Sequence, residues 1–361
     1  MRGDYVMEFS RHDTTVIKGI AICLMLYHHL FGFSERLTEV TYVSLFYFNG
    51  TNLSECLGAF GKVCVPLFTL LSGYGCYMSS CRTDNTQALV QRQITRLYKS
   101  FWTVFFVCLP ILIYEHRALR SQLLYEIIYN FLNISTSFNG EWWFILPFTV
   151  LLIFFPMIKH FLERKESSFC TDVFLLVVLT SLLTNLSAPL GEVFSFSTLS
   201  ENMFWMLLEL TPPFITGCIF AKYNILSRTK EKFGGHPLCC IAALIMLGVA
   251  FLERPYLTVF YDYIIASVLT VSVIILLPTK PMILLGKVFE KLGEESTYMW
   301  LVHSFFCYYW LPKLTYMPKY SPLIFLWLLL LSFVSAKIIR LIRKYFGVLC
   351  DKLAQRNGAA A

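Results

Sequence analysis

The chain has 361 residues, of which 57% are hydrophobic, 17% aromatic and only 15% charged, and its mean hydropathy is +0.61. Soluble domains carry about a quarter charged residues, so this composition excludes an ordinary cytosolic protein, a disordered chain and a nucleic-acid-binding protein. A bilayer core about 30 Å thick is crossed by a helix of roughly 20 apolar residues, and a chain of this length has room for about ten crossings. We therefore expect an all-α membrane protein.

Apolar runs long enough to cross a bilayer recur along the whole chain. They lie at residues 16–33, 56–79, 97–115, 142–162, 169–188, 203–221, 237–253, 255–278, 294–311 and 321–341. The first run is not followed by a small-residue cleavage site, so it is interpreted as a retained span and not as a signal peptide. We expect a polytopic transmembrane domain over residues 1–345, a short cytoplasmic tail over 346–361, and a cloning remnant at 358–361.

Lysine and arginine are unequally divided between the two sets of loops. With these spans, 23 of the 30 cations are assigned to the termini and the loops on their side, together with the adjoining ends of the spans, and six to the opposite loops. Because cationic loops stay in the cytoplasm, we expect both termini there. The one cation left, Lys62, lies inside the second span, where a charge costs at least about 2.5 kcal/mol. We expect its side chain to face a cavity or a partner.

Other ionisable residues also lie within the spans or at their outer ends. They are His28, His29, Glu141, Glu209, Asp262 and His303. Such residues form substrate pathways and catalytic sites, although any single one could instead be a polar contact that joins two helices. No Cys-x-x-Cys or Cys/His spacing suggests a metal site, and we expect none.

Three of these residues are expected at one depth in the outer half of the membrane. His29 follows Lys18 by eleven residues, or about 16 Å along a helix, which places it well above the cytoplasmic surface. Lys62 has a comparable depth, and Glu141 begins the fourth span from outside. A histidine, a cation and a carboxylate that meet in this way can form an acid/base site with an oxyanion-stabilising cation.

The cytoplasmic end of the spans has a different character. Lys18, Arg92 and Arg96 lie there, and the two arginines are one helical turn apart on the same face. They would suit the phosphates of a cytoplasmic ligand. The alternative is that both arginines only determine topology.

Five segments, taken in order, resemble the landmarks of the acyltransferase-3 family of membrane acyltransferases. The first has a basic residue, ten intervening residues and a histidine. The segments are residues 18–29, 60–74, 91–96, 141–145 and 292–303, and the resemblance extends from about residue 16 to residue 341. The family usually has arginine where this chain has Lys18 and Lys62, and lysine cannot make the bidentate contact of arginine with phosphate.

The resemblance implies an O-acetyltransferase of the plasma membrane, which is the inner membrane of a bacterium. Such an enzyme takes an acyl group, here expected to be acetyl, from acetyl-CoA in the cytoplasm, with no permanently bound cofactor. It places that group on a hydroxyl of a cell-surface or lipid-linked glycan at the outer side. By position, His29 matches the essential histidine of the family.

The residues then receive the following expected roles. His29 is the general base, Glu141 orients the imidazole or binds sugar, and Lys62 stabilises charge at the reacting centre. The donor nucleotide is held by Lys18, Arg92 and Arg96, and the acceptor contacts Trp142, Trp143, Glu209 and His303. The tryptophans could alternatively belong to an interfacial aromatic belt.

Three alternatives to direct transfer stay open at this point. The first is a covalent acyl-histidine relay. The second is a polysaccharide exporter, since charged residues in spans also line transport pathways. The third is a non-catalytic partner in a glycan-assembly complex.

Overall fold

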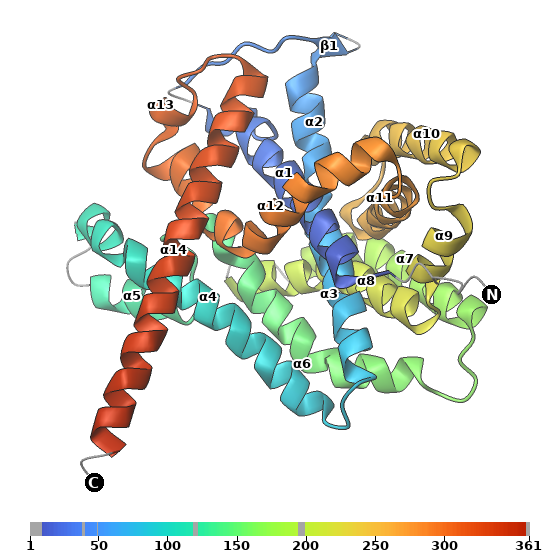
Figure 1. Cartoon of the computed structure of the whole chain (residues 1–361), viewed down its shortest axis with the longest axis horizontal. Coiled ribbons are helices and arrows are strands. Elements are labelled where there is room, and N and C mark those ends of the chain that lie inside the picture. The colour runs from blue at the N-terminus through green and yellow to red at the C-terminus, as the bar shows by residue number, and fades with distance from the viewer. Residues whose placement is uncertain (1–8, 38–39, 49, 118–121, 194–198, 359–361) are drawn as a thin grey trace.

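The computed structural model describes residues 9–37, 40–48, 50–117, 122–193 and 199–358, and its regular structure is almost entirely helical (Figure 1). Residues 359–361 of the expected cloning remnant lie outside this described part of the chain. Within it, nine helical stretches are long and apolar enough to cross a membrane. They are residues 11–31, 53–80, 86–115, 140–162, 169–186, 204–222, 237–256, 259–276 and 321–346. The expectation of an all-α membrane protein is confirmed.

The helices follow one another along the chain with short connections. They are α1 Arg11–Phe31, α2 Leu53–Gly61, α3 Cys64–Ser80, α4 Thr86–Glu115, α5 Leu123–Phe131, α6 Ile145–Leu162, α7 Phe169–Val193, α8 Leu199–Lys222, α9 Ile225–Phe233, α10 Pro237–Glu253, α11 Asp262–Leu276, α12 Lys280–Ser304, α13 Pro312–Thr315 and α14 Ser321–Gly358. Short helical turns include η1 Ser34–Arg36, η3 Gly140–Phe144 and the π-helical η6 Phe305–Tyr309. Two strands, β1 Tyr47–Phe48 and β2 Thr51–Asn52, pair antiparallel with Tyr47 opposite Asn52.

The tenth expected span, residues 294–311, is not among the nine apolar stretches. It corresponds to the second half of α12 followed by η6. The first half of α12 carries charges such as Lys287, Glu290 and Lys291, so no long stretch of that helix is apolar. The second half is nevertheless buried, because it packs along α1.

Two helix pairs, α1 with α12 and α3 with α8, make the closest approaches in the bundle. A Cβ atom on Gly293 of α12 would lie 1.9 Å from the carbonyl oxygen of Thr15, and one on Gly217 of α8 would lie 1.9 Å from that of Leu70. Only a residue without a side chain fits at such a distance, and small residues bring backbones together in this way between membrane helices. These pairs form the framework that carries the site described below.

The second expected span consists of two helices. α2 ends at Gly61 and α3 begins at Cys64, so Lys62 and Val63 lie in a turn between them. The two helices continue one another in Figure 1. The turn places the Lys62 side chain beside α8, where Glu209 is its partner.

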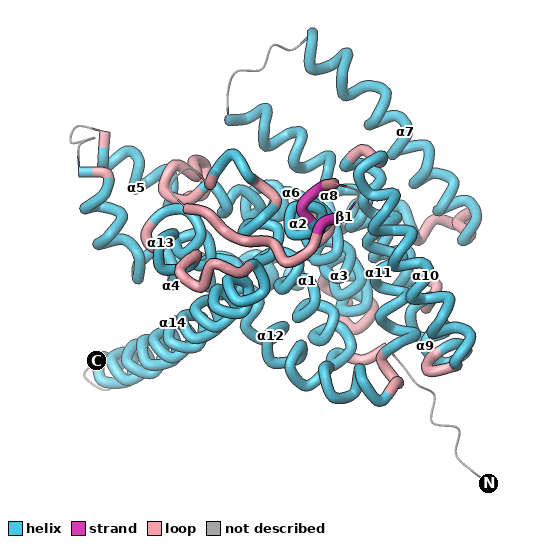
Figure 2. Tube along the Cα trace, turned by 90° about the horizontal axis from the view of Figure 1, so that it is seen from above, coloured by secondary structure: helices cyan, strands magenta, loops and turns pink. Residues whose placement is uncertain are grey.

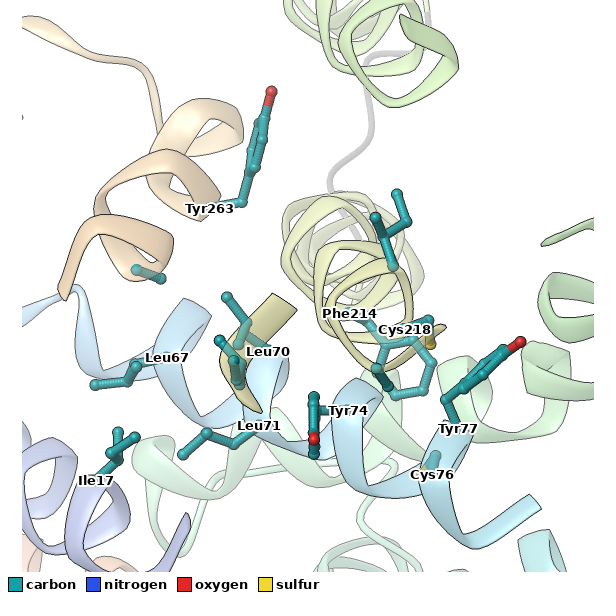
Figure 3. Close-up of a cluster of buried hydrophobic side chains, with 14 of the residues drawn as sticks. Ile17, Leu67, Leu70, Leu71, Tyr74, Cys76, Tyr77, Phe214, Cys218 and Tyr263 are labelled. Carbon is teal, nitrogen blue, oxygen red and sulfur yellow. The ribbon is translucent and has the colours of Figure 1, made fainter. Parts of the chain in front are cut away.

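The interior is apolar and centred on α3. Leu67 and Leu70 of α3 lie between Ile17 of α1, Phe214 of α8 and Tyr263 of α11 (Figure 3). By contrast, α7, α10 and α14 lie at the periphery (Figure 2). Large apolar side chains of α10, such as Leu238 at 71% exposed, point away from the protein. Such faces suit contact with lipid.

Candidate active site

A cavity of about 890 Å³ lies between α1, α3, α8 and α12. Six of the ten site residues expected from the sequence line this one cavity. They are Lys18, His29, Lys62, Glu141, Trp143 and Glu209, and His28 lines it as well. Lys18 and His29 stand about 16 Å apart along α1, so the cavity extends over a large part of the depth of the bundle. The three residues expected to converge, His29, Lys62 and Glu141, all line this cavity, and Lys18, which was expected at a separate cytoplasmic end, lines it too.

At the His29 end of the cavity, an imidazole and a guanidinium flank one carboxylate. The Nε2 atom of His29 lies 3.5 Å from Oε2 of Glu141, and both side chains are nine-tenths buried. The other carboxylate oxygen, Oε1, accepts a hydrogen bond of 2.8 Å from Arg36 in η1. Burial alone would lower the pKa of Arg36, but the hydrogen bond and the charge of Glu141 outweigh it and raise that pKa, so the guanidinium stays charged.

The other side of the His29 ring contacts Tyr308 of η6. The Nδ1 atom of His29 lies 3.3 Å from the Tyr308 hydroxyl oxygen, and the same hydroxyl donates a hydrogen bond to the main-chain carbonyl of His29. The guanidinium of Arg36 also lies against Tyr308, with its Cζ 5.1 Å from the ring centre. The imidazole therefore has the Tyr308 hydroxyl at Nδ1 and the Glu141 carboxylate near Nε2.

Two further histidines surround His29. The ring of His303 lies with its centre 4.6 Å from that of His29, but His303 is fully buried and does not line the cavity. Its Nδ1 donates to the carbonyl of Trp300 at 2.6 Å. His303 thus lies behind His29, not where a substrate would contact it. His28 lines the cavity, and its Nδ1 donates to the carbonyl of Gly58 at 2.7 Å.

Lys62 and Glu209 form an ion pair across the cavity wall. Their Nζ and Oε1 atoms are 3.5 Å apart, and the side chains are 36% and 18% exposed. Nearby, Asp262 at the start of α11 binds Arg254 at 2.8 Å. Lys62, the cation within the second expected span, therefore has a carboxylate partner. Such a partner offsets the free-energy cost of a charged side chain inside a membrane.

The two adjacent tryptophans of η3 have different surroundings. Trp142 is fully buried, its ring packs edge-on against Phe101 and Phe305, and its indole N–H donates to the carbonyl of Leu301 at 3.0 Å. It does not line the cavity, so the structure gives it no position from which to contact an acceptor. Trp143 lines the cavity.

Arg92 and Arg96 lie in a second, smaller pocket of about 390 Å³ on α4. Lys99 of the same helix and Arg343 of α14 line it too. Within the described residues, none of these four cations is paired with a carboxylate. Arg343 instead donates to the hydroxyls of Ser100 and Tyr298 at 2.9 and 2.7 Å, which joins α14 to α4 and α12. An open pocket with four cations suits a ligand with several phosphates.

Four residues of these sites were not expected from the sequence, and one of them, Lys99, had counted only as a topology determinant. Arg36 lies in an outer loop, Arg343 in a cationic stretch explained by topology, and Tyr308 is one of many aromatic residues in an apolar run. The only usable signal was for Arg36, since a lone cation close to the end of the His29 helix is a natural partner for a nearby carboxylate.

Comparison with known proteins identifies the family of the chain. The profile of a family described as an acyltransferase domain, the acyltransferase-3 family, matches residues 12–340. No curated protein and no solved structure matches the chain.

Proposed function

We propose that this chain, a multi-pass membrane acyltransferase that belongs to the acyltransferase-3 family, transfers an acetyl group from acetyl-CoA to a glycan hydroxyl. The donor binds from the cytoplasm. The acceptor is a cell-surface or lipid-linked glycan at the outer side of the plasma membrane of a bacterium.

The observation that carries this proposal is the shared cavity. Its wall includes Lys18 in the first half of α1 and His29, in the last turn of that helix, with Glu141. A reaction that joins a cytoplasmic thioester to an external hydroxyl needs both reactants to reach one base inside the membrane. A continuous lined space along α1 provides such a meeting place.

In the proposed reaction His29 acts as general base. A ring nitrogen takes the proton of the acceptor hydroxyl while its oxygen attacks the thioester carbonyl, and the carbon–sulfur bond then breaks. The imidazolium returns the proton to the departing CoA thiolate. Glu141, 3.5 Å from Nε2, stabilises the imidazolium between these two steps.

Lys62 supports the developing charge on the thioester oxygen. It lines the same cavity, and its pairing with Glu209 holds the ammonium at the wall. Because the pair is long at 3.5 Å and partly exposed, the ammonium keeps the capacity to bind a second anion.

The nucleotide end of the donor is assigned to the cytoplasmic cations. Lys18 lines the main cavity, and Arg92 and Arg96 line the neighbouring basic pocket with Lys99 and Arg343. Phosphates bind best to several cations that have no carboxylate partner of their own, which is the situation of the pocket cations in the described part of the chain.

The acceptor end is assigned to the wall around Trp143, with Glu209 as a hydrogen-bond acceptor for sugar hydroxyls. An exposed indole face stacks on the apolar face of a sugar ring, and a carboxylate accepts hydrogen bonds from its hydroxyls.

The proposal is tested with purified protein in lipid nanodiscs and acetyl-CoA labelled in the acetyl group. We expect release of CoA, measured with a thiol-reactive dye, and label in the glycan fraction of the membranes that express the protein. Neither binding nor hydrolysis of acetyl-CoA, together with movement of unmodified glycan across the membrane, would favour an exporter. Binding without any turnover would favour a non-catalytic partner.

A further inference from the structure

The hydroxyl of Tyr308 touches His29 at two points, and together these points fix where the imidazole proton lies. One contact is to the main-chain carbonyl of His29 and the other to the ring atom Nδ1. A tyrosine hydroxyl has one proton to donate and lone pairs with which to accept. A carbonyl oxygen can only accept, so the hydroxyl proton is used on that contact.

The ring contact must therefore run in the opposite direction. With its proton on the carbonyl, the Tyr308 oxygen can only accept from Nδ1, which requires a proton on Nδ1. The guanidinium of Arg36, which also lies against Tyr308, has no acceptor that could take the hydroxyl proton. Every arrangement that satisfies both contacts has a proton on Nδ1.

We propose that Tyr308 is a positioning residue that holds neutral His29 in the Nδ1–H tautomer and leaves Nε2 unprotonated as the base. The catalytic consequence rests on the proposed acyltransferase function, whereas the tautomer rests on the hydrogen bonds alone. The opposite tautomer would bond Nε2–H to Glu141 and turn the basic lone pair toward Tyr308. That lone pair would then face a tyrosine and not a substrate.

The distances around Glu141 agree with this assignment. Nε2 is 3.5 Å from Oε2, longer than a charge-assisted hydrogen bond, as expected if no proton lies between them. Once Nε2 has taken the acceptor proton, the imidazolium can donate to this carboxylate. Glu141 is then a partner of the charged ring.

The local backbone explains how Tyr308 reaches His29. The helix that contains His303 ends at Ser304, and the chain continues as one π-helical turn, Phe305–Tyr309. A π-turn inserts one extra residue and rotates the side chains that follow it, and such turns are frequent at functional sites. Tyr308 lies in this turn, beside the last turn of α1.

A second tyrosine provides a matched control. The Tyr316 hydroxyl donates to the carbonyl of Leu30 at 2.7 Å, one residue after His29, and this side chain is buried outside the cavity. Tyr308→Phe and Tyr316→Phe each remove one hydrogen bond between α1 and the segment after α12. Only Tyr308→Phe also removes a contact to the imidazole.

The test is nuclear magnetic resonance of the full chain in nanodiscs, with ¹³C,¹⁵N-labelled histidine and the His29 signals assigned by difference from His29→Gln. We expect the Nδ1–H tautomer in the unsubstituted protein and in Tyr316→Phe, and a shift toward Nε2–H in Tyr308→Phe. If nine-tenths of the ring changes tautomer, kcat falls about tenfold while the Kd of acetyl-CoA is unchanged.

An Nε2–H tautomer in the unsubstituted protein would overturn the proposal, and this result needs no variant to fold. An unchanged His29 spectrum in Tyr308→Phe would overturn it too. A tautomer shift in a protein that transfers no acetyl group would support the role of Tyr308 and refute the acyltransferase function. Failure of the proposed role of Tyr308 and failure of the proposed acyltransferase function therefore give different results.

Discussion

Trp142 and Trp143 are neighbours in η3, but their surroundings assign them different roles. Trp142 is enclosed by aromatic rings and hydrogen-bonded through its indole, whereas Trp143 lines the cavity. We expect Trp142→Ala to lower the free energy of unfolding by about 3 kcal/mol or more, because it leaves a large cavity. Trp143→Ala should instead raise the KM of the acceptor about two- to tenfold, the value of one aromatic contact.

Thermal unfolding in detergent and initial rates at varied acceptor concentration measure these two effects separately. A Trp142→Ala protein with unchanged thermal stability but a raised acceptor KM would contradict the assignment, and would return Trp142 to the acceptor site.

For individual residues, the sequence shows which charged groups lie within spans, but it does not show which residues they contact. His29, Lys62, Glu141 and Glu209 were recognisable because a polar residue in an apolar span needs a reason. Trp142 and Trp143 are adjacent residues in a helical turn and therefore point in different directions. Hydropathy does not show which of the two points into the cavity. Tyr308 was not recognisable at all, since a π-turn has no sequence signature.

At the scale of elements, the close crossing of α1 and α12 depends on two glycines, Gly293 of α12 and Gly19 of α1, whose added Cβ would lie 1.9 Å from the carbonyl oxygen of Phe289. Gly293→Ala would place a methyl group 1.9 Å from the carbonyl oxygen of Thr15, which is backbone and cannot rotate away. We expect the helices to separate locally, with a loss of about 1–3 kcal/mol in unfolding free energy. The separation should also lower activity, because His29 and Tyr308 come from these two chain segments.

The matched control for this prediction is on the same helix. A Cβ on Gly286 would have nothing nearer than a side-chain atom of Val16 at 4.0 Å, so Gly286→Ala should fold at least as stably as the unsubstituted protein. Equal thermal stability of the two alanine variants would show that α1 and α12 do not cross as closely as described.

The second prediction for these elements concerns the basic pocket on α4 and its affinity for acetyl-CoA. Ala substitution of both Arg92 and Arg96 should weaken acetyl-CoA binding by about 2 kcal/mol or more, after a discount for solvent and non-additivity. Arg82→Ala is the control, since Arg82 is an exposed cation on the same side that does not line the pocket. Unchanged affinity in a correctly inserted double variant would reduce Arg92 and Arg96 to determinants of topology.

Most elements were predictable from hydropathy, because the length of an apolar run determines whether a helix can cross the bilayer. The exceptions have local causes. The second span breaks at Lys62, and Pro66, four residues later, lacks the N–H that would bond to the carbonyl of Lys62. The second half of α12 is buried because it packs along α1. The proline is visible in the sequence, whereas the burial of α12 depends on contacts between helices, which a single run of sequence does not contain.

At the scale of the whole molecule, the uneven division of cations predicts cytoplasmic termini. In intact cells, the variant Lys232→Cys should not react at that position with a membrane-impermeant thiol reagent, whereas Thr51→Cys should. Both positions are exposed. The exposed native residues Cys81 and Cys170 lie on the expected cytoplasmic side and should be protected as well. Labelling of the Lys232→Cys variant at position 232 from outside would reverse the orientation of the chain.

The central claim is that one base in the membrane, His29, performs acetyl transfer inside the cavity that it shares with Lys18. General-base catalysis contributes about 10²–10⁴ in rate, or roughly 3–5 kcal/mol. His28 is the natural comparison, because it is adjacent and buried but has its Nδ1 bonded to the carbonyl of Gly58, away from Glu141.

The most direct measurement is the rate of acetyl transfer from labelled acetyl-CoA to membrane glycan by the unsubstituted protein, His29→Ala and His28→Ala, with acetyl-CoA affinity measured on the same samples. The account predicts that His29→Ala binds acetyl-CoA but loses at least about 100-fold in transfer rate, and that His28→Ala loses much less. A His29→Ala protein that acetylates its acceptor near the unsubstituted rate would contradict it.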